Sequence, residues 1–215
     1  MNISIIDYNS GNLASLKNSL ESAIKNKNKN FKIKITDKPE EIIKSDKVIL
    51  PGVGDFFNCK EQLLKISGML EAINFYIKEK AKPFLGICIG MQLMAKVSYE
   101  RNKNKGLELI DSEVILIKSN YKKLRVPHMG WNNVFLENKK NYKDFSSLDN
   151  NDFYFVHSYH MKCKNHNEIL AYTTYGEKIV SAILKDNLIG VQFHPEKSQE
   201  KGKKFLEEFL DWDPK

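Results

Sequence analysis

The sequence predicts an α/β fold with a central, mostly parallel sheet flanked by helices, and with additional antiparallel strands in the C-terminal half. Up to about residue 105, short apolar segments alternate with segments that have helical periodicity. That alternation is typical of a parallel sheet covered on both faces. Beyond this point, strand-like segments follow one another without helices between them. Strands joined by short connections pair antiparallel, so we expect an antiparallel extension of the sheet.

The N-terminal half supplies the parallel strands and their helical connections. A stripe of leucines with Ile24, beginning at Leu13, predicts a helix after the first strand. A longer helical region runs from about Asn58 to Lys80, broken near Ser67-Gly68, and another helix begins near Gly90. The segments predicted as strands are Ile3–Asp7, Lys32–Thr36, Val48–Leu50, which is stopped by Pro51-Gly52, and Pro83–Ile87.

The C-terminal half is expected to consist of strands and to end in one amphipathic helix, which carries Phe205 and Phe209 on one side. The chain has 215 residues, of which 41% are hydrophobic, and this is enough for one substantial core. No segment has the composition of a linker, so we expect a single domain over residues 1–215. The predicted strands are Val114–Ile117, Val134–Leu136, Phe153–His157, Ile169–Thr174, Ile179–Leu184 and Leu188–Phe193.

Composition argues against several classes of function. The formal net charge is +7, but the lysines are spread along the chain and form no basic stripe with interleaved aromatic residues, so we expect no nucleic-acid binding. No apolar run approaches the roughly 18 residues of a membrane span, and the chain starts with a strand-like segment in place of a leader. Three cysteines without a C-x-x-C pair indicate neither a disulfide framework nor a zinc site. We expect a cytoplasmic protein without a bound metal.

A cysteine between two glycines is the first candidate for catalysis. Cys88 is the centre of the segment GICIG, between an apolar strand and a predicted helix. The pattern G-x-C-x-G is typical of a nucleophile elbow, a tight turn that holds a reactive atom at the carboxyl edge of a sheet. We expect this turn to lift Cys88 into the open, where the helix N-terminus favours the nucleophilic thiolate. The alternative is a small buried thiol that packs a strand end.

A cysteine nucleophile needs a base, and among the five histidines His194 is the strongest candidate. It follows an apolar strand in the segment GVQFHPE, and the Glu196 carboxylate can accept the other imidazole N–H. Cys88, His194 and Glu196 would then be nucleophile, base and orienting group. His157 and His160 are three residues apart in what we predict to be one strand, which directs them to opposite faces. We expect structural or binding roles for both and no shared metal site.

Catalysis also needs hydrogen-bond donors where negative charge develops on the substrate. The loop PGVGDF, which begins at Pro51, follows a strand at the predicted carboxyl edge of the sheet, and its peptide groups are candidates for an oxyanion hole. The N–H of Ile89, directly after the candidate nucleophile, is the second donor that we expect. An ordinary strand-to-loop turn is the alternative, and no Lys-Ser/Thr follows to indicate a phosphate-binding loop.

Several segments together resemble a known family. LGICIGMQLM around Cys88, LPGVGDF and GVQFHPEKS are similar to segments of class I, triad-type glutamine amidotransferases, in which a cysteine hydrolyses the side-chain amide of glutamine and releases ammonia. DYNSGN from Asp7, VPHMGWN from Val126 and YFVHSY from Tyr154 resemble the glutaminase subunits of imidazole glycerol phosphate synthases. The resemblance spans nearly the whole chain and implies a class I glutamine amidotransferase-like fold.

The resemblance also implies roles for individual residues. Cys88 would be the nucleophile, His194 the general base and then acid, and Glu196 the group that orients His194. Val53 and Ile89 would supply the oxyanion donors, and the Val53 peptide would turn into place only when a partner subunit is ready. The residues implied in glutamine binding are Gly52, Gln92, Glu100, Ser158 and Tyr159, the last two through their backbone.

In this family the glutaminase docks on a (β/α)8-barrel cyclase, through which ammonia reaches the acceptor. The resemblance therefore implies a heterodimer that uses L-glutamine, no cofactor in this chain, and formation of imidazole glycerol phosphate and an aminoimidazole carboxamide ribonucleotide (AICAR) in histidine biosynthesis. Two alternatives stay open: a paralogous subunit that supplies ammonia for amination of a sugar in surface-glycan synthesis, and a stand-alone cysteine hydrolase of γ-glutamyl compounds. The residues implied at or near the partner interface are Asn12, Trp131, Tyr154 and Lys197.

Overall fold

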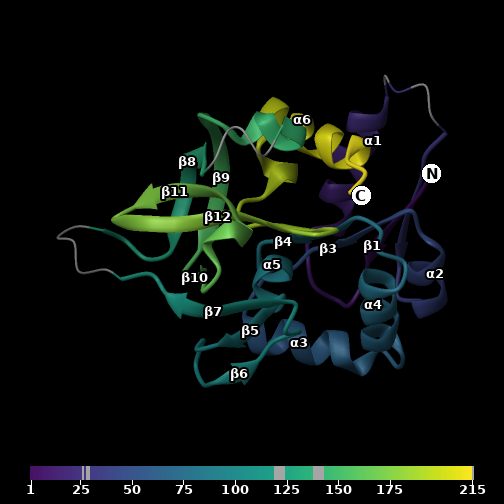
Figure 1. Ribbon diagram of the computed structural model, residues 1–215, viewed down its shortest axis with the longest axis horizontal. Coiled ribbons are helices and arrows are strands. Elements are labelled where there is room, and N and C mark those ends of the chain that lie inside the picture. The colour runs from purple at the N-terminus through teal and green to yellow at the C-terminus, as the bar shows by residue number, and fades with distance from the viewer. Residues whose placement is uncertain (26, 28–29, 119–123, 138–142, 215) are drawn as a thin grey trace.

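The computed structural model describes residues 1–25, 27, 30–118, 124–137 and 143–214. Its centre is a nine-stranded sheet in the order β2-β1-β3-β4-β13-β12-β11-β8-β9 (Figure 1). The first five strands of that order run parallel, and their apolar residues are nearly all buried because helices cover both faces. These strands are β2 (Lys32–Thr36), β1 (Asn2–Ile6), β3 (Lys47–Leu50), β4 (Phe84–Ile87) and β13 (Leu188–Val191).

Helices lie on both sides of the parallel strands, with α1 and α6 on one side and α3 and α4 on the other (Figure 1). Each presents an apolar stripe to the sheet, as Leu16 and Leu20 do in α1. Among the described residues, none of the helices combines the length and the apolar character needed to cross a bilayer. The helices are α1 (Leu13–Ile24), α2 (Pro39–Lys44), α3 (Phe56–Lys65), α4 (Met69–Lys78), α5 (Ile89–Leu93) and α6 (Gln199–Asp211).

The antiparallel extension of the sheet is confirmed. Strands β13, β12, β11, β8 and β9 each pair antiparallel with the next, and a separate four-stranded sheet has the order β10-β7-β5-β6. The bounds of these strands are β12 (Glu177–Lys185), β11 (Ile169–Tyr175), β8 (His128–Leu136), β9 (Asn151–His157), β10 (Tyr159–Cys163), β7 (Ile110–Leu116), β5 (Ala95–Ser98) and β6 (Asn104–Lys105). Short 3₁₀ helices are η1 (Lys143–Leu148), η2 (His166–Glu168) and η3 (Pro195–Lys197).

The helix expected to begin near Gly90 is confirmed as α5. It ends at Leu93, because the N–H groups of Leu107 and Leu109 bond the carbonyls of Leu93 and Met94 at 2.8 and 3.0 Å and draw the chain into β5. The expectation that His157 and His160 share one strand is wrong. His157 and His160 lie in different strands, β9 and β10, because the chain changes sheets at Ser158. The break expected near Ser67-Gly68 is confirmed, and Gly68 has φ +79° at the start of α4.

A cluster of aromatic rings fixes the end of β13 against the C-terminal helix. The ring centroid of Phe193 lies 4.2 Å from that of Phe153 and 5.6 Å from that of Phe205, and Phe145 lies 5.8 Å from Phe205. All four side chains are fully buried. Burial of this size is a main source of folding free energy. The cluster holds η3, which begins after His194, in a fixed place between the sheet and α6.

The contact between α6 and η3 gives a test of this packing. A Cβ added to Gly202 in α6 would lie 1.9 Å from the carbonyl oxygen of Pro195, so Gly202→Ala must push the helix away. We expect a loss of about 1 to 3 kcal/mol in the free energy of unfolding, measured by urea denaturation. The exposed neighbour Lys201→Ala should change it little. A Gly202→Ala protein as stable as the parent would contradict this packing.

Candidate active site

The turn at Cys88 has the backbone of a nucleophile elbow. Cys88 follows β4 and precedes α5 with φ +54° and ψ −109°, a conformation that non-glycine residues rarely adopt outside functional sites. The flanking glycines are needed for close packing, because a Cβ at Gly90 would lie 1.8 Å from the Leu50 carbonyl oxygen and one at Gly86 2.7 Å from the Gly90 carbonyl oxygen. The expectation that Cys88 is lifted into the open is wrong: it is 3% exposed and lies at the base of a pocket.

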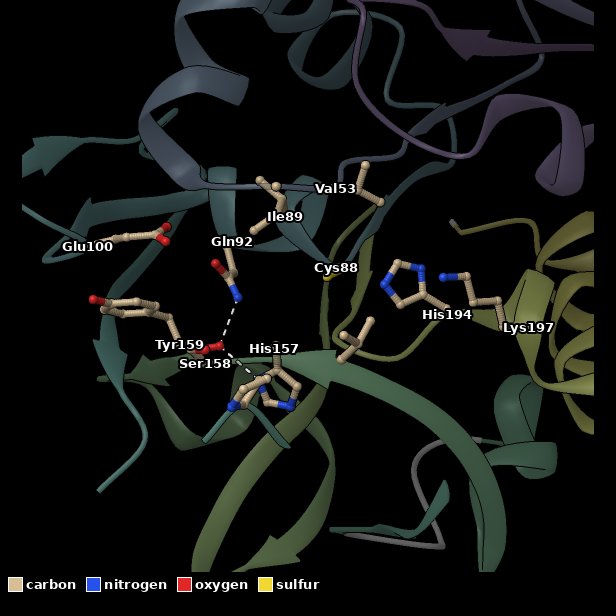
Figure 2. A pocket seen from close by; sticks show the side chains of 13 residues that line it. Val53, Cys88, Ile89, Gln92, Glu100, His157, Ser158, Tyr159, His194 and Lys197 are labelled. Atoms are coloured by element: carbon tan, nitrogen blue, oxygen red, sulfur yellow. Dashed lines mark hydrogen bonds between the residues drawn. The ribbon is translucent and has the colours of Figure 1, made fainter. Parts of the chain in front are cut away.

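His194 and Glu196 form a buried pair beside Cys88. His194 Nδ1 lies 2.8 Å from Glu196 Oε1, and both side chains are buried. His194 Nε2 has no hydrogen-bond partner among the described residues, and Figure 2 shows the ring beside Cys88 in the pocket. Burial alone lowers the pKa of His194, but the charges of Cys88 and Glu196 outweigh burial and raise that pKa to about 10. The imidazole is therefore protonated at neutral pH when it faces a thiolate.

The backbone of His194 is held by the neighbouring strand β9. Its N–H donates to the Tyr154 carbonyl at 2.9 Å. Ser198 Oγ donates to the His194 carbonyl at 2.6 Å and accepts from the Tyr154 N–H at 3.0 Å. Tyr154 thus bonds the peptide groups of His194 both directly and through Ser198, so that the position of the imidazole depends on β9.

The structure brings most of the predicted site residues to one pocket of about 350 Å³ (Figure 2). Gly52, Glu196 and Asn12 border a smaller cleft on the other side of His194, while Trp131 and Tyr154 lie on the surface nearby. Pro127, Val156 and His157 also line the pocket. The predicted residues around the pocket are Val53, Cys88, Ile89, Gln92, Glu100, Ser158, Tyr159, His194 and Lys197.

The loop expected to form the oxyanion hole has one donor turned away from Cys88. The Val53 N–H donates to Ser10 Oγ at 3.1 Å, and Ser10 Oγ donates back to the Val53 carbonyl at 2.9 Å. Cys59 Sγ also donates to that carbonyl at 3.3 Å. Both polar groups of Val53 are therefore bonded outside the pocket. Gly52 is tightly packed, since a Cβ there would lie 2.7 Å from Tyr8 Oη.

The residues expected to bind glutamine differ in how much of their hydrogen-bonding capacity is free. Gln92 Oε1 is buried without a partner among the described residues. Glu100 Oε2 accepts from the Phe56 N–H at 2.8 Å. Burial raises the pKa of the Glu100 carboxyl, against the opposing effect of that bond. The Tyr159 carbonyl is already occupied, because it accepts from Gln92 Nε2 at 2.9 Å and from His157 Nδ1 at 2.8 Å.

A pair of buried histidines connects the pocket to β8. Burial lowers the pKa of His157 to about 3 and that of His128 to about 4, so both are neutral. His157 donates from Nδ1 to the Tyr159 carbonyl, and its bare Nε2 accepts from His128 Nδ1 at 2.9 Å. His128 Nε2 then accepts from Asn132 Nδ2 at 3.1 Å. Among the described residues, no group of three or more His, Cys, Asp or Glu side chains is placed to hold a metal ion.

Three of the residues expected at a partner interface, Trp131, Tyr154 and Lys197, form a partly exposed aromatic face beside the pocket. Trp131 is 49% exposed and pairs across β8 and β9 with Tyr154, with 6.1 Å between ring centroids. Lys197 Nζ lies 5.7 Å from the centre of the Tyr154 ring. Met129, which the sequence interpretation missed, extends this face and is 62% exposed. Asn12 is exposed at the start of α1, where its side chain accepts from the Ser15 N–H.

The sequence interpretation also missed Ser10, His128, Gln192 and Ser198, which bond the residues of the site. Gln192 had a signal, because it is a polar residue between the apolar Val191 and Phe193. Ser10 had none, since Val53 is 43 residues away. His128 and Ser198 each bond a distant residue, His157 and Tyr154 respectively, as well as one that is four residues away.

Comparisons with known proteins agree with this fold. The chain matches the family described as glutamine amidotransferase class-I over residues 5–212. It is 38% identical over 216 residues to imidazole glycerol phosphate synthase subunit HisH of Rhodopseudomonas palustris, covering 100% of both chains. It is 41% identical over 212 residues to the protein of the same name from Pelagibacter ubique, covering 98% of this chain and 100% of that one.

Solved structures share the fold at low sequence identity. One described as a glutamine amidotransferase has a TM-score of 0.69 at 16% identity, covering 97% of this chain and 98% of its own. A glutamine amidotransferase from Thermotoga maritima has a TM-score of 0.60 at 19% identity, covering 98% of this chain and 83% of its own. These likenesses support the fold, and the family match and the full-length relatives decide the family. The chain is therefore a member of the class I glutamine amidotransferase family.

Proposed function

We propose that this chain hydrolyses glutamine to glutamate and ammonia with Cys88, His194 and Glu196, as the glutaminase subunit of an imidazole glycerol phosphate synthase. One observation carries the proposal: a cysteine on a strained elbow shares a pocket with a histidine whose Nδ1 is 2.8 Å from a buried carboxylate. The unpartnered Nε2 of that histidine is the atom that would exchange a proton.

In the proposed reaction, Cys88 Sγ attacks the carboxamide carbon of glutamine, and the carbonyl electron pair moves to oxygen. The tetrahedral intermediate collapses to a thioester, and the leaving ammonia takes a proton from the His194 imidazolium. Water then gives a proton to His194 and attacks the thioester, releasing glutamate and restoring the thiolate. The N–H groups of Ile89 and, after its peptide turns, Val53 would hold the oxyanion.

The proposed partner is a (β/α)8-barrel cyclase that uses the ammonia to form imidazole glycerol phosphate and AICAR. The full-length relatives are named as subunits of imidazole glycerol phosphate synthase, which favours this role over amination of a sugar. The exposed side chains of Met129 and Trp131, with the half-buried Tyr154 beside them, have the apolar and aromatic character typical of a docking surface. Asn12 and Lys197 would lie at or near its edge.

The nucleophile can be tested by substitution. Cys88→Ala should fold, keep binding glutamine and lose glutamine-dependent turnover, because no other cysteine of the described residues lines the pocket. In complex with the cyclase it should keep turnover with added ammonia. Cys163→Ala is the control, since Cys163 lies outside the pocket. Hydrolysis of glutamine by Cys88→Ala at near the parent rate would refute the assignment.

The bond between Ser10 and Val53 supports a low activity for the isolated chain. Ser10→Ala removes the acceptor that holds the Val53 N–H, so the peptide should turn more readily. We expect glutamate release without a partner to rise roughly fivefold, the effect of one hydrogen bond of about 1 kcal/mol. Ser10→Thr keeps a hydroxyl and should resemble the parent.

If Ser10→Ala releases glutamate without a partner at the same rate as the parent, the bond from Val53 to Ser10 does not limit the activity of the isolated chain. Gly52→Ala is a poorer test of the same switch, because its Cβ would collide with Tyr8 Oη and would lie 2.9 Å from Ile89 Cβ. A loss of activity in Gly52→Ala would result from this collision as well as from the lost backbone freedom, and the two causes would not be separated.

Glu100 should make glutamine binding depend on pH. As the pH falls, a carboxyl of raised pKa protonates earlier than an ordinary glutamate and loses its attraction for the substrate ammonium. The KM for glutamine should therefore rise on the acid side, beginning above the pH expected for an ordinary glutamate. Glu100→Gln should have a high KM that no longer changes over this range. A parent KM that stays constant there would argue against Glu100 as the ammonium ligand.

A further inference from the structure

Gln192 is a polar side chain at a fully buried position next to the nucleophile. It is 0% exposed, and it follows β13 where the sequence is otherwise apolar. Its backbone N–H donates to the Ser181 carbonyl at 2.9 Å, which continues the pairing with β12. The side chain contacts Gln92 Nε2 at 3.0 Å and Cys88 Sγ at 3.7 Å. A buried amide is retained in a core only when its polar atoms are satisfied.

The neighbours fix which end of the Gln192 amide faces the sulfur. The Tyr159 carbonyl can only accept, so the atom of Gln92 that bonds it at 2.9 Å must be Nε2. The same Nε2 bonds Gln192, and an amide nitrogen cannot accept, so the Gln192 atom there must be Oε1. The Nε2 of Gln192 is left facing Cys88 Sγ. The sulfur therefore receives an N–H donor from the side of β13.

We infer that Gln192 is a positioning residue that donates a hydrogen bond to the Cys88 thiolate and at the same time fixes the amide of Gln92, the residue proposed to hold glutamine. This inference rests on the proposed function of the pocket. A donor to the charged sulfur favours the thiolate and restricts its direction of attack. Because Gln92 uses Nε2 for Tyr159 and Gln192, its Oε1 remains free to accept from the substrate.

Two substitutions separate the two contacts. Gln192→Glu keeps an oxygen that can accept from Gln92 but, when ionised, has no donor for the sulfur. Gln192→Met has similar length and loses both contacts. Ser181→Ala is the matched control, because Ser181 is also fully buried, lies in the adjacent strand, and its hydroxyl has no hydrogen-bond partner among the described residues.

The first measurement is the rate at which iodoacetamide alkylates Cys88 in the isolated chain, followed by mass spectrometry of the Cys88 peptide. At about pH 8 we expect both Gln192 variants to react roughly tenfold more slowly than the parent, the effect of one hydrogen bond to a charged group. In Gln192→Glu, acidification protonates the introduced carboxyl and gives it a donor, so the difference from the parent should shrink. Ser181→Ala should react like the parent.

The second measurement is glutaminase kinetics in the complex with the cyclase. Gln192→Glu should lower kcat with little change in KM, because the contact with Gln92 is kept, whereas Gln192→Met should lower kcat and raise KM. If Gln192 acted through packing alone, the two variants would not differ in whether KM changes together with kcat. Circular dichroism establishes that each variant is folded. If Gln192→Met fails to fold, Gln192→Glu still decides the question.

The inference is overturned if folded Gln192→Glu is alkylated as fast as the parent, or if its kcat is unchanged. The alkylation measurement needs no glutamine, so it can fail or succeed independently of the proposed function. Activity retained by Cys88→Ala would instead overturn the proposed function and leave the alkylation result standing.

Discussion

The parallel pairing of β4 with β13 is the interaction on which the rest of the site depends. Gly86 lies opposite Gly190 and Ile87 opposite Val191, and the Cys88 N–H then bonds the Val191 carbonyl at 2.7 Å. Parallel strands in register end at the same edge of a sheet, so the elbow and the segment that carries His194 emerge side by side. Glycine at 190 keeps this approach close, because a Cβ there would lie 2.8 Å from Met91 Cγ in α5. A slip of one residue would reverse which side chains face α5 and would separate the thiol from the imidazole.

The site that forms at this edge is built from buried polar groups, and burial makes their orientations specific. The His194 and Glu196 side chains are almost completely covered, and Gln92 and Gln192 lie deeper still. A buried donor without an acceptor is costly, so each amide and imidazole has one favourable orientation. The neutral histidines at 128 and 157 obey the same constraint. Their bonds extend the ordered arrangement from the pocket to Asn132 in β8.

Strand β9 contributes Tyr154 to the exposed aromatic face and also bonds the backbone of His194. The side chain of Tyr154 packs against Trp131 and Lys197 on the outside, while its backbone holds the peptide groups of His194 on the inside. This face therefore includes a residue of β9, the strand that holds the backbone of His194. The loop at Val53 is a separate element, held by Ser10 from the connection that precedes α1. The position of the imidazole thus depends on β9, and that of the Val53 peptide depends on Ser10.

Local sequence patterns determined the parallel strands, the break at Gly68 and the turn at Cys88, because periodicity and glycine placement act within a few residues. They also singled out His194 and Glu196, since a histidine at a strand end with a nearby carboxylate is a local pattern, and the family resemblance extended the assignment along the chain. The end of α5, the change of sheet at Ser158, the Ser10 bond that holds the turned Val53 peptide and the place of Gln192 were decided only by the tertiary structure. Each depends on hydrogen bonds between residues far apart in the chain, such as Ser10 with Val53 and Gln92 with Gln192. Local propensity carries no information about which distant donor will meet which acceptor once water is excluded.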